Sequence, residues 1–501
     1  MVIAFFLLVF VLYLFNGIIF LDPDFGWHLR MGQLIISSGV PKTDPFSYTM
    51  PSFPFIDHEW LTNLLIAKFY HFVDKSGLAF IYSLLALLAV FLATINPLSR
   101  KVAKMFNPSR FMYVPFILGT GTLFAFSGVR PQIESWLFFS IFLIIVLNYF
   151  IWKRLFWVLP FFVILWSNLH GSFAVSIVTL LLIAFLRSIR QKKVWLDGFL
   201  VAFICLLATF INPYGTRLWH EVLQQVTNTS VRWTILEWRP AIFVPNIAMW
   251  GLISVSTLLL LRYRRKFRLE ELGLNFWFLL QGLASVRHIP LWVMVNLPMF
   301  VLSIKFFGQE AARFKYGRSR FARVYRFAIW GSILIFIIQT MLHILSTTII
   351  FSRENFYPKS AILFLKNNPP VGQIFSEYGW GGYLIWKLPE KKVFIDGRMA
   401  TWKWDADLPG QSNYAMKDYL GILMGEISYQ EIFEKYGIDT VLWPLREERY
   451  VFGILQNMLE KLLINLGMEI PTLDLLERIK EDGWVVSYQD STSIIYREGV
   501  D

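Results

Sequence analysis

Long apolar stretches alternate with short polar connections over the first 349 residues of this 501-residue chain. Stretches of this kind can cross the hydrocarbon core of a bilayer as helices, and about eleven can be threaded, which predicts a polytopic α-helical membrane fold. Several are short for a full crossing, which predicts helices that end early at an outer cavity. They fall near residues 1–21, 77–97, 111–128, 131–151, 155–168, 171–187, 195–212, 242–261, 271–286, 289–306 and 325–348.

The connections between these stretches alternate in charge. One set holds 22 Lys or Arg against 4 Asp or Glu, whereas the other holds 9 of each. Because basic connections are retained in the cytoplasm, the first set is predicted to be cytoplasmic and the second to lie at the outer face. The net charge of +12 therefore reflects membrane topology and does not indicate a nucleic-acid partner.

The amino-acid composition narrows the class of protein further. A mean hydropathy of +0.51 with 56% hydrophobic residues excludes an ordinary soluble protein. The single cysteine, Cys205, excludes an intramolecular disulfide and a cysteine metal cluster. Residues 1–21 lack a basic start and a small-residue cleavage site before Asp22, so we expect a retained first span in a multi-pass protein of the cell membrane.

The connection after the first span, residues 22–76, is long and predicted to lie outside. Residues 26–37 and 57–73 have helical apolar spacing and are predicted to lie flat at the interface. Residues 39–55 contain four prolines and are predicted to be irregular. We assign this loop to a transmembrane domain that covers residues 1–349.

Residues 350–501 change in character, with 16 Lys or Arg against 22 Asp or Glu. The pattern predicts a short helix within 352–370, β-rich segments over 373–388 and 391–402, a helix and strand over 431–444, and a closing hairpin over 483–498. This is typical of a small α/β domain, which the parity of the preceding spans places outside the cell.

Carboxylates and histidines gather in the first outer loop. Asp22 and Asp24 flank a proline directly after the first span; helix capping accounts for one of them, and the pair together indicates a functional site. His28 follows at the start of the first loop helix. A second group of ionisable residues, Asp57, His58 and Glu59, lies at the start of the second loop helix, where Asp57 is a candidate cap. Consecutive ionisable residues at membrane depth are costly unless they are paired or used.

Cationic or titratable side chains occur in the remaining outer connections, at Arg130, His170, Arg287 and His288. Each alone is typical of an interfacial residue whose charged end reaches water. Together, facing the outer carboxylates, they are candidates for holding a phosphate group. Asp396-Gly397-Arg398 is predicted to form a sharp turn with a structural Asp–Arg pair, and the chain contains no phosphate-cradling glycine loop, HExxH or serine-elbow motif.

Several motifs carry a resemblance. They are DPDFGWHLRMGQLI (22–35), GVPKTDPFSYT (39–49), FIDHEW (55–60), NLHGSF (168–173), NPYG (212–215), YGWGGYLIWKL (378–388) and VFIDGR (393–398). They resemble a prokaryotic group of largely uncharacterised integral membrane proteins. More broadly, a carboxylate-bearing first outer loop, many short spans and a C-terminal extracytoplasmic domain are similar to membrane glycosyltransferases of the GT-C fold.

The GT-C resemblance implies a sugar donor linked to a lipid, commonly polyprenyl phosphate, and an envelope glycan, lipid or protein acceptor. It places the acidic motif on Asp22 and Asp24. GT-C enzymes often carry adjacent acids, whereas Pro23 separates these two, which leaves open which one is the base. We favour Asp24, because transfer requires a carboxylate that accepts the proton of the acceptor hydroxyl. A divalent cation, Mg²⁺ or Mn²⁺, is a candidate cofactor held by the remaining acids.

The alternative is a non-catalytic protein, either a transporter or an assembly factor for envelope polysaccharide. A transporter is expected to carry ionisable residues near the centres of its spans. Here they cluster at the outer ends, which favours the enzyme.

Overall fold

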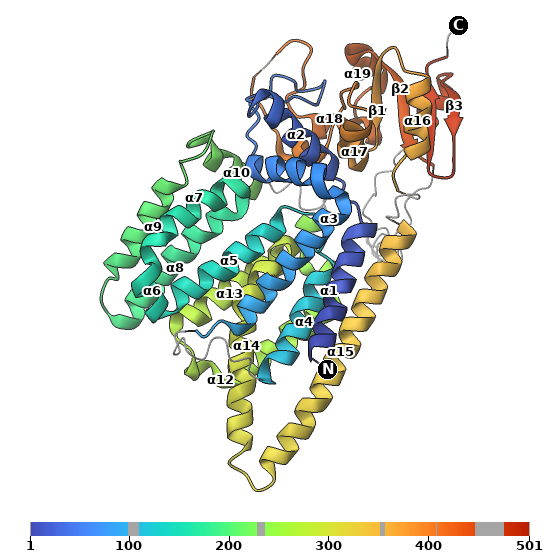
Figure 1. Cartoon of the computed structure of the whole chain (residues 1–501). Coiled ribbons are helices and arrows are strands. Elements are labelled where there is room, and N and C mark those ends of the chain that lie inside the picture. Colours follow the sequence, from blue (N-terminus) through green and yellow to red (C-terminus); the bar gives the residue numbers. More distant parts are fainter. Residues whose placement is uncertain are drawn as a thin grey trace. The chain divides into compact units, whose positions relative to one another are not determined.

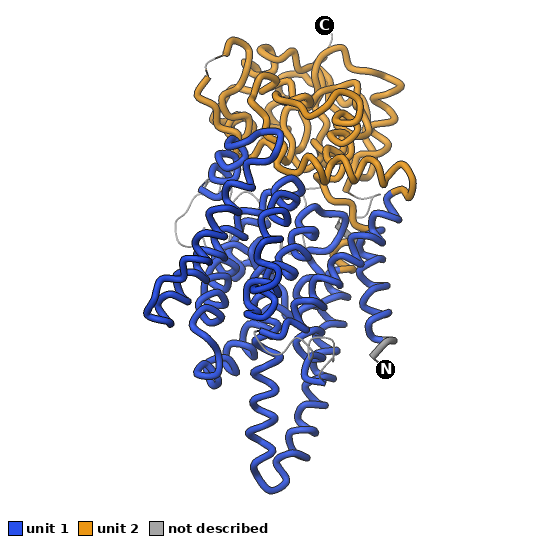
Figure 2. The backbone as a smooth tube through the Cα atoms, turned by 60° about the vertical axis from the view of Figure 1, so that its left-hand side comes forward, with its two compact units in different colours: residues 1–18, 75–343 blue, residues 19–74, 344–501 orange. Residues whose placement is uncertain are grey.

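The computed structural model describes residues 2–98, 110–227, 236–350, 356–406, 408–445 and 475–499. The chain forms two compact units, coloured separately in Figure 2. The first, here called the helical unit, comprises residues 1–18 and 75–343. The second, here called the mixed unit, comprises residues 19–74 and 344–501, so the first loop and the C-terminal region share one unit. The sequence-based division at residue 349 instead kept that loop with the transmembrane domain.

Helices, most of them apolar, make up the helical unit (Figure 1). They are α1 (Val2–Ile19), the second part of α3 (Trp60–Ile95), α4 (Tyr113–Phe124), α5 (Gln132–Leu147), α6 (Tyr149–Leu155), α7 (Leu159–Leu169), α8 (Ala174–Gln191), α9 (Leu196–Ala208), α10 (Arg217–Thr227), α12 (Ile247–Tyr263), α13 (Leu269–Ala284), α14 (Ile289–Ala311) and α15 (Gly317–Ile350). Six helical segments of the described chain are long and apolar enough to cross a membrane, and shorter apolar helices accompany them. The count of about eleven spans stays a prediction.

Helix α14 is the centre of the helical unit. It packs against α4, α5, α12 and α13. In its most apolar stretch, 83% is buried within the protein, against 22% for the corresponding stretch of α15. A helix that is apolar on all sides is expected in such an enclosed position.

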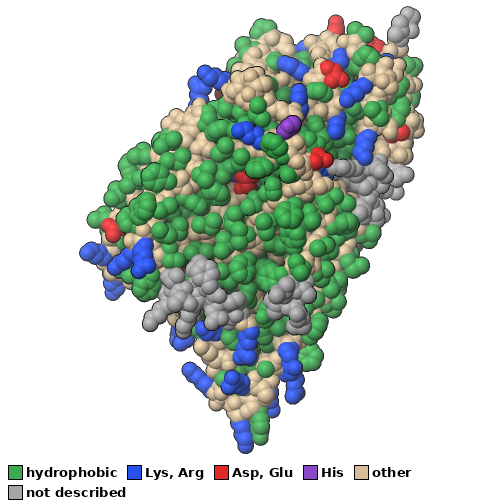
Figure 3. Space-filling view, in the orientation of Figure 1, with side chains coloured by type: hydrophobic (Ala, Val, Ile, Leu, Met, Phe, Trp, Pro, Cys, Tyr) green, Lys and Arg blue, Asp and Glu red, His purple; other side chains and the backbone are tan. Residues whose placement is uncertain are grey.

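The outer surface of the helical unit is largely apolar. Figure 3 shows hydrophobic side chains over most of it, and Lys and Arg along its lower and left-hand end. The exposed basic residues at the end of α8, the end of α12 and the start of α15 include Lys192, Lys193, Arg264, Arg265, Arg318 and Arg320. An exposed apolar surface of this extent suits lipid rather than water. The predicted assignment of this end to the cytoplasm agrees with its charge but stays a prediction.

The mixed unit combines helices with one sheet. Its elements are α2 (Phe25–Ser38), the first part of α3, α16 (Lys359–Asn367), β1 (Gln373–Ser376), α17 (Gly381–Lys387), α18 (Ala415–Met424), α19 (Tyr429–Tyr436), β2 (Ile438–Pro444), α21 (Leu475–Glu481), β3 (Val485–Gln489) and β4 (Ser493–Arg497). The strand order is β1-β2-β4-β3, with β1 and β2 parallel and the other pairs antiparallel. The apolar side chains of β1 and β2 lie buried beneath α18 and α19.

Most element predictions in the mixed unit are confirmed. Both loop helices, the irregular segment 39–55, helix α16, the α19–β2 pair and the closing hairpin form as expected. The prediction of strand over 373–388 is wrong in its second half, because residues 381–387 form helix α17. Residues 391–402 give only isolated bridges at Val393 followed by a short 3-10 helix, Gly397–Thr401, so this segment is not β-rich.

Glycines allow α2 to approach its neighbours closely. A methyl group built on Gly26 would lie 2.0 Å from the carbonyl oxygen of Gly382 in α17. One built on Gly32 would lie 1.9 Å from the carbonyl oxygen of Asn63 in α3. Such distances cannot be relieved by a side-chain rotation, because the opposing atoms belong to the backbone. The sequence positions of these glycines therefore fix how α2 packs within the mixed unit.

We expect Gly26→Ala to lower the thermal unfolding midpoint of the purified protein by several degrees, since overpacking of a closed contact costs ~1–3 kcal/mol. Gly251→Ala in α12 is the matched control, because nothing lies within 4 Å of a methyl group at that position. Equal midpoints for the two variants would contradict the close packing of α2 on α17.

Candidate functional site

Asp22 and Asp24 play different local roles at the start of α2. The backbone N–H of Asp24 donates a hydrogen bond of 2.9 Å to Oδ1 of Asp22, so the Asp22 side chain stabilises the turn before the helix. Asp24 occupies the N-cap position, but its side chain makes no capping hydrogen bond. A local turn therefore accounts for the Asp22 side chain, whereas the half-buried carboxylate of Asp24 is not used as a cap.

The Asp24 carboxylate lies against the turn at Asp396-Gly397-Arg398. A methyl group built on Gly397 would lie 2.0 Å from Oδ1 of Asp24. Gly381, at the start of α17, permits a similarly close approach to the carbonyl oxygen of Ile395. Gly397 thus leaves room for the Asp24 carboxylate beside the backbone, which no larger residue would, and Gly381 lets α17 approach the backbone before Gly397.

Glu377, which directly follows strand β1, is a third acid of the mixed unit. Its Oε2 atom is enclosed and has no hydrogen-bond partner among the described residues. Burial raises the pKa of Glu377 to about 7, although the backbone N–H groups of Gly379 and Trp380 oppose the shift. A carboxyl group that titrates near neutral pH is suited to proton transfer.

Tyr357 lies among these three acids. Its hydroxyl donates a hydrogen bond of 2.7 Å to the carbonyl oxygen of Leu21. Burial raises the pKa of Tyr357 well above its usual value, and the negative charges of Asp22, Asp24 and Glu377 raise it further. The tyrosine is therefore a fixed neutral donor that ties the end of the first span to the C-terminal region.

A second network joins α2 to the start of α3. The amide nitrogen of Asn63 donates to both carboxylate oxygens of Asp57, at 3.0 and 2.8 Å. The amide oxygen of Asn63 consequently faces Nδ1 of His28, at 2.7 Å, so Nδ1 carries the proton. Asp57 also accepts from the backbone N–H of Glu59. Because α3 begins at Trp60, this bond stabilises the turn before the helix, and Asp57 is not its N-cap.

The charges of this network are enclosed. Burial raises the pKa of Asp57, while the hydrogen bond from Asn63 and the nearby His58 oppose the rise. Glu59 is 6% exposed and lies 3.6 Å from Nδ1 of His28 and 3.6 Å from Nε2 of His58. The predicted residues of both loop helices therefore come together, with Asp57 and Asn63 orienting the His28 ring.

A buried Asp–Arg–Asp triad lies at the centre of the mixed unit. Arg398 forms an ion pair of 2.8 Å with Asp44 of the first loop and one of 2.6 Å with Asp396. The aromatic rings of Trp27, Phe46, Phe55 and Trp402 surround its guanidinium at 5.0–5.9 Å. Burial alone would lower the pKa of Arg398, but Asp396 and Asp44 raise it above its usual value. The prediction of a structural Asp–Arg pair is thus supported, with Asp44 as a second partner.

Two of the predicted cations come together in the helical unit. Arg130 forms an ion pair of 2.8 Å with Glu237, and Arg287 lies over the Trp238 ring at 5.0 Å. Burial would raise the pKa of Glu237, but Arg130 and Arg287 outweigh it and lower that pKa. Two cations therefore share one carboxylate, which leaves a local excess of positive charge.

The two predicted histidines of the helical unit lie at helix starts. Nδ1 of His170 accepts a hydrogen bond from the backbone N–H of Ser172 at 3.1 Å and lies 3.0 Å from the hydroxyl of Ser135. Because Nδ1 is an acceptor, the ring is neutral and caps the 3-10 helix before α8. His288 precedes α14 without a side-chain capping bond. A phosphate-binding role for either residue stays a prediction.

The candidate divalent cation requires several ligands around one point. Among the described residues, no three or more His, Cys, Asp or Glu side chains are grouped so that they could hold a metal ion. Asp22, Asp24 and Glu377 approach Tyr357 but are not arranged as such a set. We therefore derive no chemical step through a metal.

Three residues of the site were not predicted from the sequence: Tyr357, Glu377 and Asn63. Glu377 lies in a segment predicted only as β-rich, although an acid that directly follows a strand is a recognisable signal. Tyr357 and Asn63 carry no such signal, because their partners are distant in the chain.

Comparisons with known proteins give little further information. No family model and no curated protein sequence matches the chain. Among solved structures, the oligosaccharyltransferase of Archaeoglobus fulgidus in complex with Zn and sulfate is similar, with a TM-score of 0.45 and 12% identity over 85% of this chain. Its apo form gives a TM-score of 0.45 and 13% identity over 87% of this chain. The chain spans 64% and 69% of the respective oligosaccharyltransferase chains, and similarity at this level does not identify a shared fold or function.

We expect Arg398→Met to destabilise the mixed unit strongly, because removing one partner of a buried ion pair typically costs ~3–5 kcal/mol. Thermal unfolding in detergent would show the loss. Lys417→Met, which removes an exposed cation from the same unit, is the matched control. A midpoint for Arg398→Met equal to that of the control would show that the triad does not hold the unit together.

The raised pKa of Glu377 makes a pH-dependent contribution to stability. A carboxyl group whose pKa rises from 4.5 to about 7 on folding favours the folded state below pH 4.5, and that contribution is lost as the pH rises through 7. Glu377→Gln, which imitates the protonated form, should flatten the stability–pH curve over this window. Glu426→Gln, at an exposed position, is the control. Parallel curves for wild type and Glu377→Gln would refute the shift.

Proposed function

We propose that this protein is a membrane glycosyltransferase that transfers a sugar from a polyprenyl-phosphate donor to an envelope glycan, lipid or protein acceptor. The observation that carries the proposal is the carboxylate of Asp24, which is half-buried, is not used as a helix cap, and lies in a space kept open by Gly397. A carboxylate held in this way without a capping role suits a base better than a packing residue.

In the proposed reaction the acceptor hydroxyl oxygen attacks the anomeric carbon of the donor sugar. The bond between that carbon and the phosphate oxygen breaks, and polyprenyl phosphate leaves with the electron pair. The Asp24 carboxylate takes the hydroxyl proton. Asp22 fixes the turn that carries Asp24, and the neutral Tyr357 hydroxyl keeps the end of the first span in place.

The departing phosphate requires positive charge. Arg130 and Arg287, which together exceed the charge of Glu237, suit this role, and His170 and His288 are weaker candidates. The proposal places Asp57, His58, Glu59 and His28 on the acceptor side, where the enclosed network orients the His28 ring. It also adopts the predicted outer location of the mixed unit.

Asp24→Asn tests the assignment at one atom. Asn retains the size of Asp, and Asp24 makes no capping bond, so folding and insertion should be unchanged. Loss of the proton acceptor should lower the rate on the order of a hundredfold or more. Release of polyprenyl phosphate is measured from the reconstituted protein with a panel of polyprenyl-phosphate hexoses and pentoses and host membrane extract as acceptor.

Asp405→Asn, an exposed substitution of the same kind, is the control. Full activity in Asp24→Asn with loss in Asp22→Asn would move the base to Asp22. Full activity in both would remove the pair from the chemistry. Absence of release by the wild type from every donor would contradict the proposal and favour the transporter or assembly factor.

A further inference from the structure

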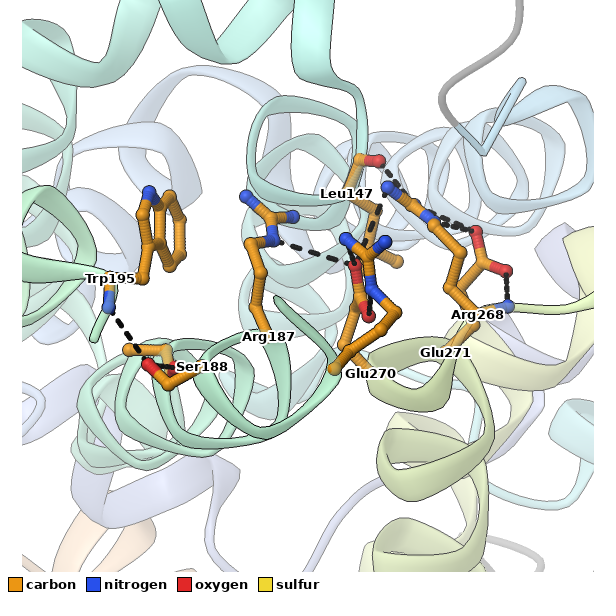
Figure 4. A network of polar contacts seen from close by, with 9 residues as sticks. Leu147, Arg187, Ser188, Trp195, Arg268, Glu270 and Glu271 are labelled. Carbon is orange, nitrogen blue, oxygen red and sulfur yellow. Dashed lines mark hydrogen bonds and ion pairs between the residues drawn. The ribbon is translucent and has the colours of Figure 1, made fainter. Parts of the chain in front are cut away.

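A buried cluster of charges joins the end of α8 to the start of α13 in the helical unit (Figure 4). At its centre is Glu270, whose side chain is fully enclosed. Arg190 contacts it through Nε at 3.0 Å and Nη2 at 3.3 Å. Arg187 and Arg268 lie at 3.4 and 3.6 Å from Oε1. One carboxylate thus has three guanidinium groups around it.

The carboxylates of the cluster do not balance its cations. The second acid, Glu271, is engaged by Arg268, which donates to it from Nη2 at 2.7 Å and from Nε at 3.0 Å. Arg268 also donates to the carbonyl oxygen of Leu147 at 2.8 Å. Arg187 and Arg190 therefore share Glu270, and the cluster retains an excess of one positive charge.

Arg187 is the incompletely paired member. Its side chain is only 5% exposed, and its Nε lies 3.4 Å from Oε1 of Glu270 as an ion pair. Within the described part of the chain neither Nε nor Nη2 makes a hydrogen bond. The guanidinium stacks on Trp195 at 4.0 Å, and Figure 4 shows it between that ring and Glu270. A stacked ring provides no acceptor for the N–H groups, and buried cations without full pairing are costly.

Exposed basic side chains follow Arg187 at the end of α8. The side chain of Arg190 is 38% exposed beside it. Lys192 and Lys193, which follow α8 directly, are both exposed. Trp195 is held in place because its backbone N–H donates to the hydroxyl of Ser188 at 2.9 Å. One end of the helical unit therefore combines the fixed ring of Trp195, the enclosed guanidinium of Arg187 and several exposed basic side chains.

We propose that this cluster binds a phosphate group, carried by an anionic phospholipid head group or present as free phosphate. Phosphate oxygens would supply the acceptors that Arg187 lacks, and guanidinium groups match phosphate geometry. The location of the cluster also suits an anionic ligand. It lies at the end of the helical unit where the exposed basic residues gather, and such residues attract anionic head groups. The site is independent of the proposed transferase site.

The test uses the full-length protein in an uncharged detergent. The thermal unfolding midpoint is followed while phosphatidylglycerol, phosphatidylcholine or inorganic phosphate is added to wild type, Arg187→Gln, Arg190→Gln and Arg320→Gln. Phosphatidylglycerol should raise the wild-type midpoint in a saturable way, and phosphatidylcholine should not, because a ligand that binds the folded state stabilises it. Arg187→Gln and Arg190→Gln should require roughly tenfold more phosphatidylglycerol for half the shift.

Arg320→Gln removes one exposed charge from the same basic end and should keep the wild-type response. If Arg187→Gln fails to fold, the exposed Arg190→Gln and the charge-retaining Arg187→Lys decide the outcome. An equal shift with inorganic phosphate at similar concentration would identify free phosphate as the ligand. No shift in the wild type, or equal half-points in wild type and both cluster variants, would overturn the proposal.

Discussion

The buried guanidinium of Arg398 is the contact on which the mixed unit depends. It joins Asp44, from the loop after the first helix, to Asp396, from the C-terminal region, in surroundings that are otherwise aromatic. Two carboxylates without the arginine would repel each other in a poorly solvated interior. The triad therefore determines which segments can pack together, and the turn at Gly397 that receives Asp24 is a direct consequence of it.

The polar sites of the two units balance their charges differently. In the mixed unit, Asn63 uses both ends of its amide to join Asp57 to His28, so a neutral residue sets the position of a titratable one. In the helical unit, Glu237 and Glu270 each serve more cations than they can neutralise. Positive charge is thus in excess at Glu237 and Glu270 of the helical unit, whereas two carboxylates share Arg398 in the mixed unit.

Local sequence patterns predicted the helices and strands well, but they predicted the contacts between distant residues poorly. The helices at 25–38, 359–367 and 429–436 follow from apolar spacing and from cap residues such as Ser428, all of which are short-range signals. The segment 381–387 has aromatic residues that favour strands, and it was predicted as strand. It forms a helix in which Gly381 packs on the backbone of residues 395 and 396 and Gly382 packs against α2. The acids at 22, 24, 57 and 59 lie in one unit, and their common role in a reaction stays a prediction. The contribution of Glu377 and Asn63 depends on contacts between distant parts of the chain, which periodicity does not report.

The discontinuity of the mixed unit has a consequence for biosynthesis. The ribosome makes Asp44 354 residues before Arg398. At translation rates of roughly 5–20 residues per second, the early loop waits on the order of twenty seconds to a minute for its partner. During that interval the loop holds aromatic side chains and acids with no core to enter. A nascent chain stalled before residue 398 would therefore present an exposed, adhesive loop, which makes this segment a natural substrate for chaperones and for quality-control proteases.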